Sequence, residues 1–148
     1  MHKQVKSQAT LKSLLQQYSK KLWVKIKSAD QPFSGDDAII HYAALVGAAQ
    51  DIEALVLNGA NVNLRGDLGL TALHIATSQK NAALVKVLLN LGANQDIKDA
   101  WGLTPIALAK VLKHKEIQEL LTLFPRLQID LEGNVPKNGR SRRKRTAS

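Results

Sequence analysis

The chain has 148 residues, of which 45% are hydrophobic and only 4% aromatic, so its core has to be built from aliphatic side chains. It contains no cysteine, which excludes disulfides, thiolate chemistry and zinc sites with cysteine ligands. The net charge of +9 is divided unevenly: residues 1–30 contribute +6, residues 31–132 contribute −3 and residues 133–148 contribute +6. A mildly acidic middle therefore lies between two basic ends.

Hydropathy gives no sign of a membrane span or a secretory signal. No apolar run approaches the ~20 residues that a membrane-spanning helix needs, and no apolar stretch of signal-peptide type follows the basic N-terminus. We expect a cytoplasmic location, or a nuclear one in a eukaryote if the basic cluster at 140–145 acts as an import signal.

The N-terminal segment predicts an amphipathic helix from about Thr10 to Lys27. Its apolar residues follow helical spacing, and lysines and glutamines occupy the opposite face. The apolar stripe comprises Leu11, Leu14, Leu15, Tyr18, Leu22, Trp23 and Ile26. We interpret it as a cap on the next part of the chain, because an exposed stripe of this size favours aggregation. A membrane-surface helix or a partner-binding helix is the alternative that the basic face leaves open.

After a linker at residues 30–35, the sequence repeats every 33 residues. Ile40, Leu73 and Ile106 occupy one position of the repeat. Two further sets of equivalent positions are Ala43, Ala76 and Ala109, and Leu55, Leu88 and Leu121. A period of this length indicates a stack of identical supersecondary units.

Each unit predicts two short helices. Thr71 can cap a helix that runs to about Gln79, and Thr104 with Pro105 opens the equivalent helix one period later. A second helix follows in each unit, and Gly59 and Gly92 suit the left-handed residue just past its end. Helices of about ten residues are not stable alone, so the units have to stack on one another.

The period, the Gly-Leu-Thr-Ala-Leu-His segment at 69–74, the Gly-Leu-Thr-Pro-Ile-Ala segment at 102–107 and the Gly-Ala-Asn turns at 59–61 and 92–94 resemble the ankyrin repeat. The resemblance implies an all-α ankyrin-repeat solenoid of helix–turn–helix units, with hairpin loops that project near 64–70 and 97–103. The domains it implies are an N-terminal capping helix and linker (1–35), repeats (36–68, 69–101 and a partial unit at 102–124) and a disordered basic tail (125–148).

The first and last units depart from the pattern, as terminal units of a solenoid do. Ala38 replaces the capping threonine, and Ala107 replaces the histidine of the repeat. After Pro125 the pattern stops, and the alternation of Leu127, Ile129 and Leu131 predicts an extended segment. Composition predicts disorder from Gly133 onward. The basic cluster of the tail comprises Arg140, Arg142, Arg143, Lys144 and Arg145.

Catalytic and metal-binding patterns are absent from the sequence. His41 and His74 stand where the resemblance implies a structural histidine, and no His-x-x-x-His spacing or phosphate-binding glycine loop occurs. We therefore expect no enzyme activity, no cofactor and no metal.

A protein partner is expected at the surfaces that ankyrin repeats use, the hairpin tips and the first helices. The residues at these positions are Leu45, Val46, Asp67, Leu68, Leu70, Ser78, Gln79, Ala100, Trp101, Leu103, Val111 and Leu112. Trp101 is the candidate anchor, since tryptophan is enriched among binding hot spots. The alternative is that Trp101 packs over its neighbouring hairpin and covers Leu68.

The sequence thus predicts a monomeric protein–protein interaction module with a regulatory, adaptor or neutralising role toward another protein. The alternative is a nucleic-acid-associated regulatory factor that uses its basic N-terminal helix and C-terminal tail, whose binding would weaken steeply with salt.

Overall fold

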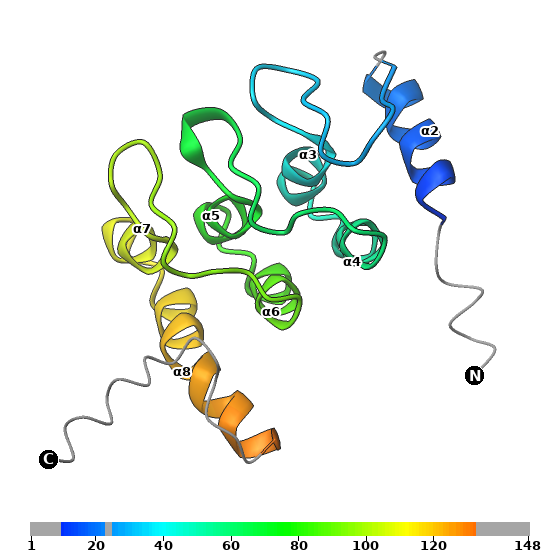
Figure 1. Cartoon of the computed structure of the whole chain (residues 1–148). Helices are drawn as coiled ribbons and strands as arrows, with labels where there is room; N and C mark the ends of the chain where they lie inside the picture. The colour runs from blue at the N-terminus through cyan, green and yellow to red at the C-terminus, as the bar shows by residue number, and fades with distance from the viewer. Residues whose placement is uncertain (1–9, 23–24, 133–148) are drawn as a thin grey trace, which may run out of the picture.

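The computed structural model describes residues 10–22 and 25–132, and it consists of helix pairs stacked in one direction (Figure 1). The first helices of the pairs, α3, α5 and α7, pack in a row, and α4, α6 and α8 form a second row beside them. The described residues contain no β-strand, only an isolated bridge between Ser34 and Asp37. The helices are α2 (Leu11–Leu22), α3 (Ile39–Leu45), α4 (Ala49–Leu57), the 3₁₀-helix η1 (Asp67–Gly69), α5 (Ala72–Ser78), α6 (Ala82–Asn90), α7 (Pro105–Val111) and α8 (Lys115–Glu132). The predicted all-α solenoid is confirmed.

Polar side chains cap the short helices as the sequence predicts. The Thr71 hydroxyl accepts the His74 backbone N–H, and the Thr104 hydroxyl accepts that of Ala107 at 3.3 Å, with Pro105 at the first helical position. In the first unit Ala38 has no capping side chain, and the His41 ring nitrogen Nδ1 accepts the Ala38 N–H at 2.9 Å instead. Each inner helix (α3, α5 and α7, the first of each pair) thus begins at a fixed residue despite its length of two turns.

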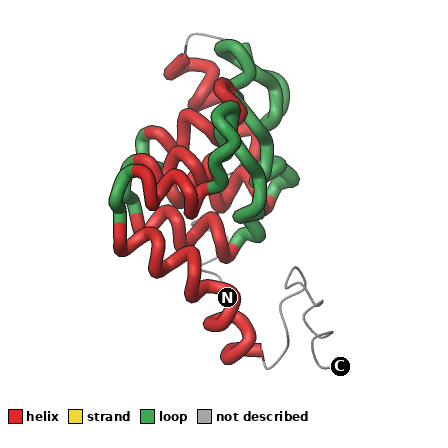
Figure 2. The backbone as a smooth tube through the Cα atoms, turned by 90° about the vertical axis from the view of Figure 1, so that its left-hand side faces the viewer, coloured by secondary structure: helices red, strands yellow, loops and turns green. Residues whose placement is uncertain are grey.

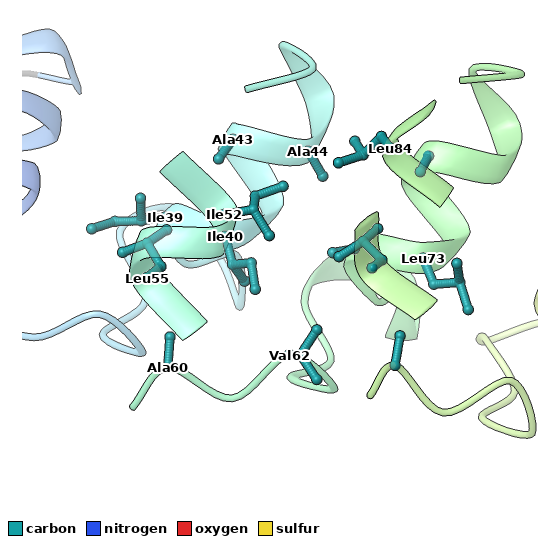
Figure 3. Close-up of a cluster of buried hydrophobic side chains, with 14 of the residues drawn as sticks. Ile39, Ile40, Ala43, Ala44, Ile52, Leu55, Ala60, Val62, Leu73 and Leu84 are labelled. Carbon is teal, nitrogen blue, oxygen red and sulfur yellow. The ribbon is translucent and has the colours of Figure 1, made fainter. Parts of the chain in front are cut away.

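The residues that coincide at the 33-residue period form the core. Ile40 and Leu73 are buried, as are Ala43, Ala76 and Ala109, whose small side chains let the inner helices approach one another. Figure 3 shows Ile39, Ile40, Ile52 and Leu55 gathered between the helices of the first unit. Ile106 is only partly buried because the outward side of the last helix pair meets solvent.

The N-terminal helix α2 caps the first unit, as predicted. Leu14 and Tyr18 are buried against the repeats, and the Tyr18 hydroxyl donates to Asp51 Oδ2 at 2.7 Å. The Tyr18 and Tyr42 rings meet edge to face at a centroid distance of 6.1 Å, and the Lys21 ammonium lies over both rings. The described part of the helix runs to Leu22 and residues 25–27 are not helical, so the predicted end at Lys27 is wrong; Trp23 lies outside the described residues.

The C-terminal end of the fold corrects one prediction. The chain is helical to Glu132, so the extended segment predicted at 127–131 is wrong, and so is the tail predicted to begin at 125. The alternation was ambiguous, because Leu127 and Leu131 are four residues apart and this spacing fits a helix as well as a strand. Residues 133–148, with the basic cluster at 140–145, lie outside the described residues. None of the described helices is long and apolar enough to cross a membrane.

Candidate partner-binding surface

Long loops project from one side of the helix stack, and short turns between paired helices lie on the opposite side (Figure 2). Each of two successive loops is closed by a backbone bond, from Gly66 N–H to the Leu70 carbonyl at 2.8 Å and from Asp99 N–H to the Leu103 carbonyl at 2.9 Å. The hairpins predicted at 64–70 and 97–103 are therefore present. A further bond, from Ala100 N–H to the Leu68 carbonyl at 2.9 Å, joins the two loops directly.

Leu68 and Trp101, one period apart, form the loop tips. Leu68 is 57% exposed and Trp101 is 65% exposed, so the alternative in which the tryptophan covers Leu68 is wrong. Leu68 also has a φ of +59°, a left-handed conformation that is unfavourable for a residue with a Cβ atom. The loop below Trp101 is held by Asp99, whose Oδ1 accepts the N–H groups of Trp101 and Leu103 at 2.9 Å.

Aspartates connect the loop before α3 to the loop before α5, a feature that the sequence did not reveal. Asp67 N–H donates to Asp37 Oδ1 at 2.8 Å, and Asp36 N–H donates to Asp67 Oδ1 at 2.7 Å. Gly66 leaves the space for this exchange, because a Cβ atom there would meet Asp37 Oδ1 and the His41 ring. Asp67, predicted to contact a partner, is exposed but already has this internal role.

The remaining predicted residues lie at the ends of the inner helices, on the side opposite the loop tips (Figure 2). An inner helix of seven residues is about 10 Å long and separates the two sites. Gln79 Nε2 donates to the Leu45 carbonyl at 2.7 Å and connects neighbouring units there. The exposed residues of this row are Leu45, Val46, Ser78, Gln79, Val111 and Leu112.

The prediction from sequence places the residues of these two surfaces in a single partner-binding site. Ala100 is exposed at the tips with Trp101, whereas Leu70 and Leu103 are half-buried at the loop bases. Helical spacing alone does not reveal on which side of a stack a turn emerges, so the separation required the structure.

The histidines hold the loops to the helices. In His74, Nδ1 accepts the Thr71 N–H at 3.2 Å, which leaves Nε2 protonated to donate to the Leu103 carbonyl at 2.9 Å. His41 does the same between the Ala38 N–H and the Leu64 carbonyl. Burial lowers the pKa of His74, partly opposed by the bond to Leu103. The neutral ring can satisfy both backbone groups at once, which is the structural role predicted for it.

The regular stack and its projecting loops define a helical repeat protein with an exposed lateral surface. The sequence model of ankyrin repeats, in three copies, matches residues 40–132, and the chain belongs to the ankyrin-repeat family. No group of three or more potential metal-ligating side chains occurs among the described residues.

Curated relatives share the repeats over short stretches. Human SH3 and multiple ankyrin repeat domains protein 2 is 40% identical over 75 residues, 51% of this chain and 4% of that protein. Human SH3 and multiple ankyrin repeat domains protein 1 is 36% identical over 107 residues, 72% of this chain and 5% of that protein. Mitochondrial disaggregase of Bos taurus is 34% identical over 93 residues, 63% of this chain and 13% of that protein. The chain therefore spans a small part of each of these relatives.

Proposed function

We propose that the chain is a non-catalytic protein-binding module that holds its partner by the loop tips and the adjoining inner helices. Ankyrin repeats are generally protein–protein interaction modules, and the family membership supports this reading. The observation that carries it is the pair of exposed apolar side chains, Leu68 and Trp101, at equivalent positions of adjacent loops. A regulatory, adaptor or neutralising role would act through this contact.

The backbone conformation of Leu68 supports a binding role for its exposed side chain. A left-handed residue other than glycine costs about 1–2 kcal/mol, and burial on a partner would return about that much for a leucine side chain. Strained residues often occur at functional sites. The bond between Ala100 and Leu68 also fixes the spacing of the two tips, so little conformational freedom is lost when a partner binds.

Replacement of Trp101 tests the proposal. A partner is first isolated by cross-linking to the full chain, and its affinity is then measured for Trp101→Ala and for the control Leu57→Ala, which removes another exposed side chain. A hot spot is worth about 2 kcal/mol or more, roughly 30-fold in affinity. We expect that loss for Trp101→Ala alone, at an unchanged urea midpoint. Retained affinity with reduced stability would refute the proposal.

A second candidate is nucleic-acid binding by the basic ends. It is favoured by exposed lysines on α2, Lys12 and Lys20, together with the net charge of +9. Phosphate contacts release counterions, so retention on DNA or RNA at low salt should weaken steeply as salt rises. Absence of retention in low salt removes this candidate.

A further inference from the structure

The two sides of the solenoid carry opposite charge. We define the loop face as residues 28–37, 61–70 and 94–103, and the turn face as residues 44–49, 77–82 and 110–115; both repeat at 33 residues. The loop face contains six aspartates against one arginine and one lysine, a net charge of −4. The turn face contains four lysines and no acidic residue, a net charge of +4. Charges separated in this way attract different partners to the two faces.

The lysines of the turn face are Lys80, Lys110, Lys113 and Lys115. All are exposed, and no acidic side chain of residues 10–22 and 25–124 lies within ion-pair distance of them. Lys80 and Lys113 have φ angles of +57° and +60°, and Gly47 has +74° at the equivalent position of the first unit. Glycine adopts this conformation freely, whereas lysine is disfavoured there. The second and third units thus keep a positive charge at a position where glycine would be more stable.

Exposed apolar side chains lie at both ends of the turn face, in the first turn and, among three of the lysines, in the third turn. Leu45 and Val46 are 56% and 48% exposed, and Val111 and Leu112 are 62% and 39% exposed. The pairs are in the first and third units, two helix spacings apart, and packed helices lie about 8–10 Å apart, so the pairs are about 20 Å from each other. A partner helix covers that distance in about 13 residues.

The turn face is held in shape by bonds between units. Gln79 donates to the Leu45 carbonyl at 2.7 Å, and His114 Nδ1 donates to the Thr77 carbonyl at 3.1 Å. Neighbouring turns are therefore fixed relative to one another, which favours a partner that contacts several turns at once.

We propose that the turn face binds a short acidic amphipathic segment of another protein. Acidic side chains of the segment would face Lys80, between the two exposed pairs, and Lys113, beside Val111 and Leu112, and apolar side chains at its ends would cover the pairs. Nucleic acid supplies the charge but no apolar cover for these pairs. The pairs are also separated by polar Ser78 and Gln79, which a helix with two apolar ends matches better than a continuous lipid surface. The inference rests on the proposed function, but it concerns a surface distinct from the loop tips.

The probe is a synthetic 16-residue peptide of leucine and glutamate, with leucines at both ends of one helical face and glutamates between them. A control peptide replaces every glutamate by lysine. Binding to the full chain is measured by calorimetry and by amide chemical shifts. We expect saturable binding of the glutamate peptide with shifts centred on the turn face, and no shifts on the turn face with the lysine peptide.

Charge reversal separates this surface from the loop tips. Lys80→Glu with Lys113→Glu should weaken binding at least tenfold. The matched control Lys12→Glu with Lys86→Glu changes net charge equally at exposed sites elsewhere and should leave affinity unchanged, as should Trp101→Ala. Loss of binding in Trp101→Ala, shifts centred on the loop face, or no saturable binding at millimolar peptide would overturn the inference. So would binding to phosphatidylserine vesicles or DNA that depends on Lys80 and Lys113 and exceeds binding to the peptide.

Discussion

Replacement of His74 by leucine should be among the most damaging single changes in the second unit. The ring satisfies two backbone groups, the Thr71 N–H and the Leu103 carbonyl, at 3.2 and 2.9 Å. Leucine fills a similar volume but bonds neither. A buried polar group without a partner costs about 1–3 kcal/mol, so two such groups predict a loss of about 2–6 kcal/mol. That is a large fraction of the stability of a typical domain.

The assay is urea unfolding of the full chain followed by circular dichroism, together with hydrogen exchange of the loop that contains Leu103. His74→Leu should lower the unfolding midpoint at an unchanged slope and expose the loop amides to exchange. Asn58→Ala is a control, because it removes a side-chain bond to the Ala54 carbonyl at a helix end that is open to water. A loss under 1 kcal/mol for His74→Leu would mean that water replaces the ring, and the reasoning would fail.

Three further predictions use the same unfolding measurement. Burial lowers the pKa of His74, so the folded chain binds fewer protons than the unfolded chain, and stability should fall as pH drops below about 6.5. The His74→Leu variant should lose less stability between pH 7.5 and 5.5 than the unchanged protein, and an equal loss would exclude His74 as the cause. Thr77→Val should raise the free energy of unfolding by about 1 kcal/mol, because the Thr77 hydroxyl is the one buried side-chain oxygen in the described residues without a hydrogen-bond partner; a decrease of that size would show that the hydroxyl is bonded. Gly66→Ala should lower the free energy of unfolding by about 1–3 kcal/mol, because the added Cβ atom would clash with Asp37 and the His41 ring. The φ of −103° at this position suits any residue, so the clash alone is tested, and an unchanged stability would mean that the loops adjust without loss.

The sequence was informative where one residue determines one local choice. Thr71 and Thr104 mark helix starts because their hydroxyls can accept an N–H three residues later. Gly59 and Gly92, at φ of +98° and +91°, mark helix ends for a reason equally local. The 33-residue period then requires that these local units stack, so most of the core could be predicted without coordinates.

The sequence was less informative where the outcome depends on contacts between neighbouring loops or units. The bond from Asp67 to Asp37 joins residues 30 positions apart in neighbouring loops, and no local pattern distinguishes them from solvent-facing aspartates. The exposure of Trp101 depends on the path of the adjacent loop, which packing and the bond between Ala100 and Leu68 determine. The same holds for the division of the predicted partner-binding residues between two faces.

That division follows from how a solenoid of short helices uses its residues. The helix bodies are occupied in packing, since Ala43, Ala76 and Ala109 have to lie against neighbouring units. Side chains free to meet a partner are therefore concentrated where the chain leaves the helices, at the loops on one side and the turns on the other. A change at Leu68 or Lys80 leaves the buried alanines in place, so each face can acquire its own charge and apolar residues with little effect on the stack. Opposite charges on the two faces are then compatible with a single uninterrupted core.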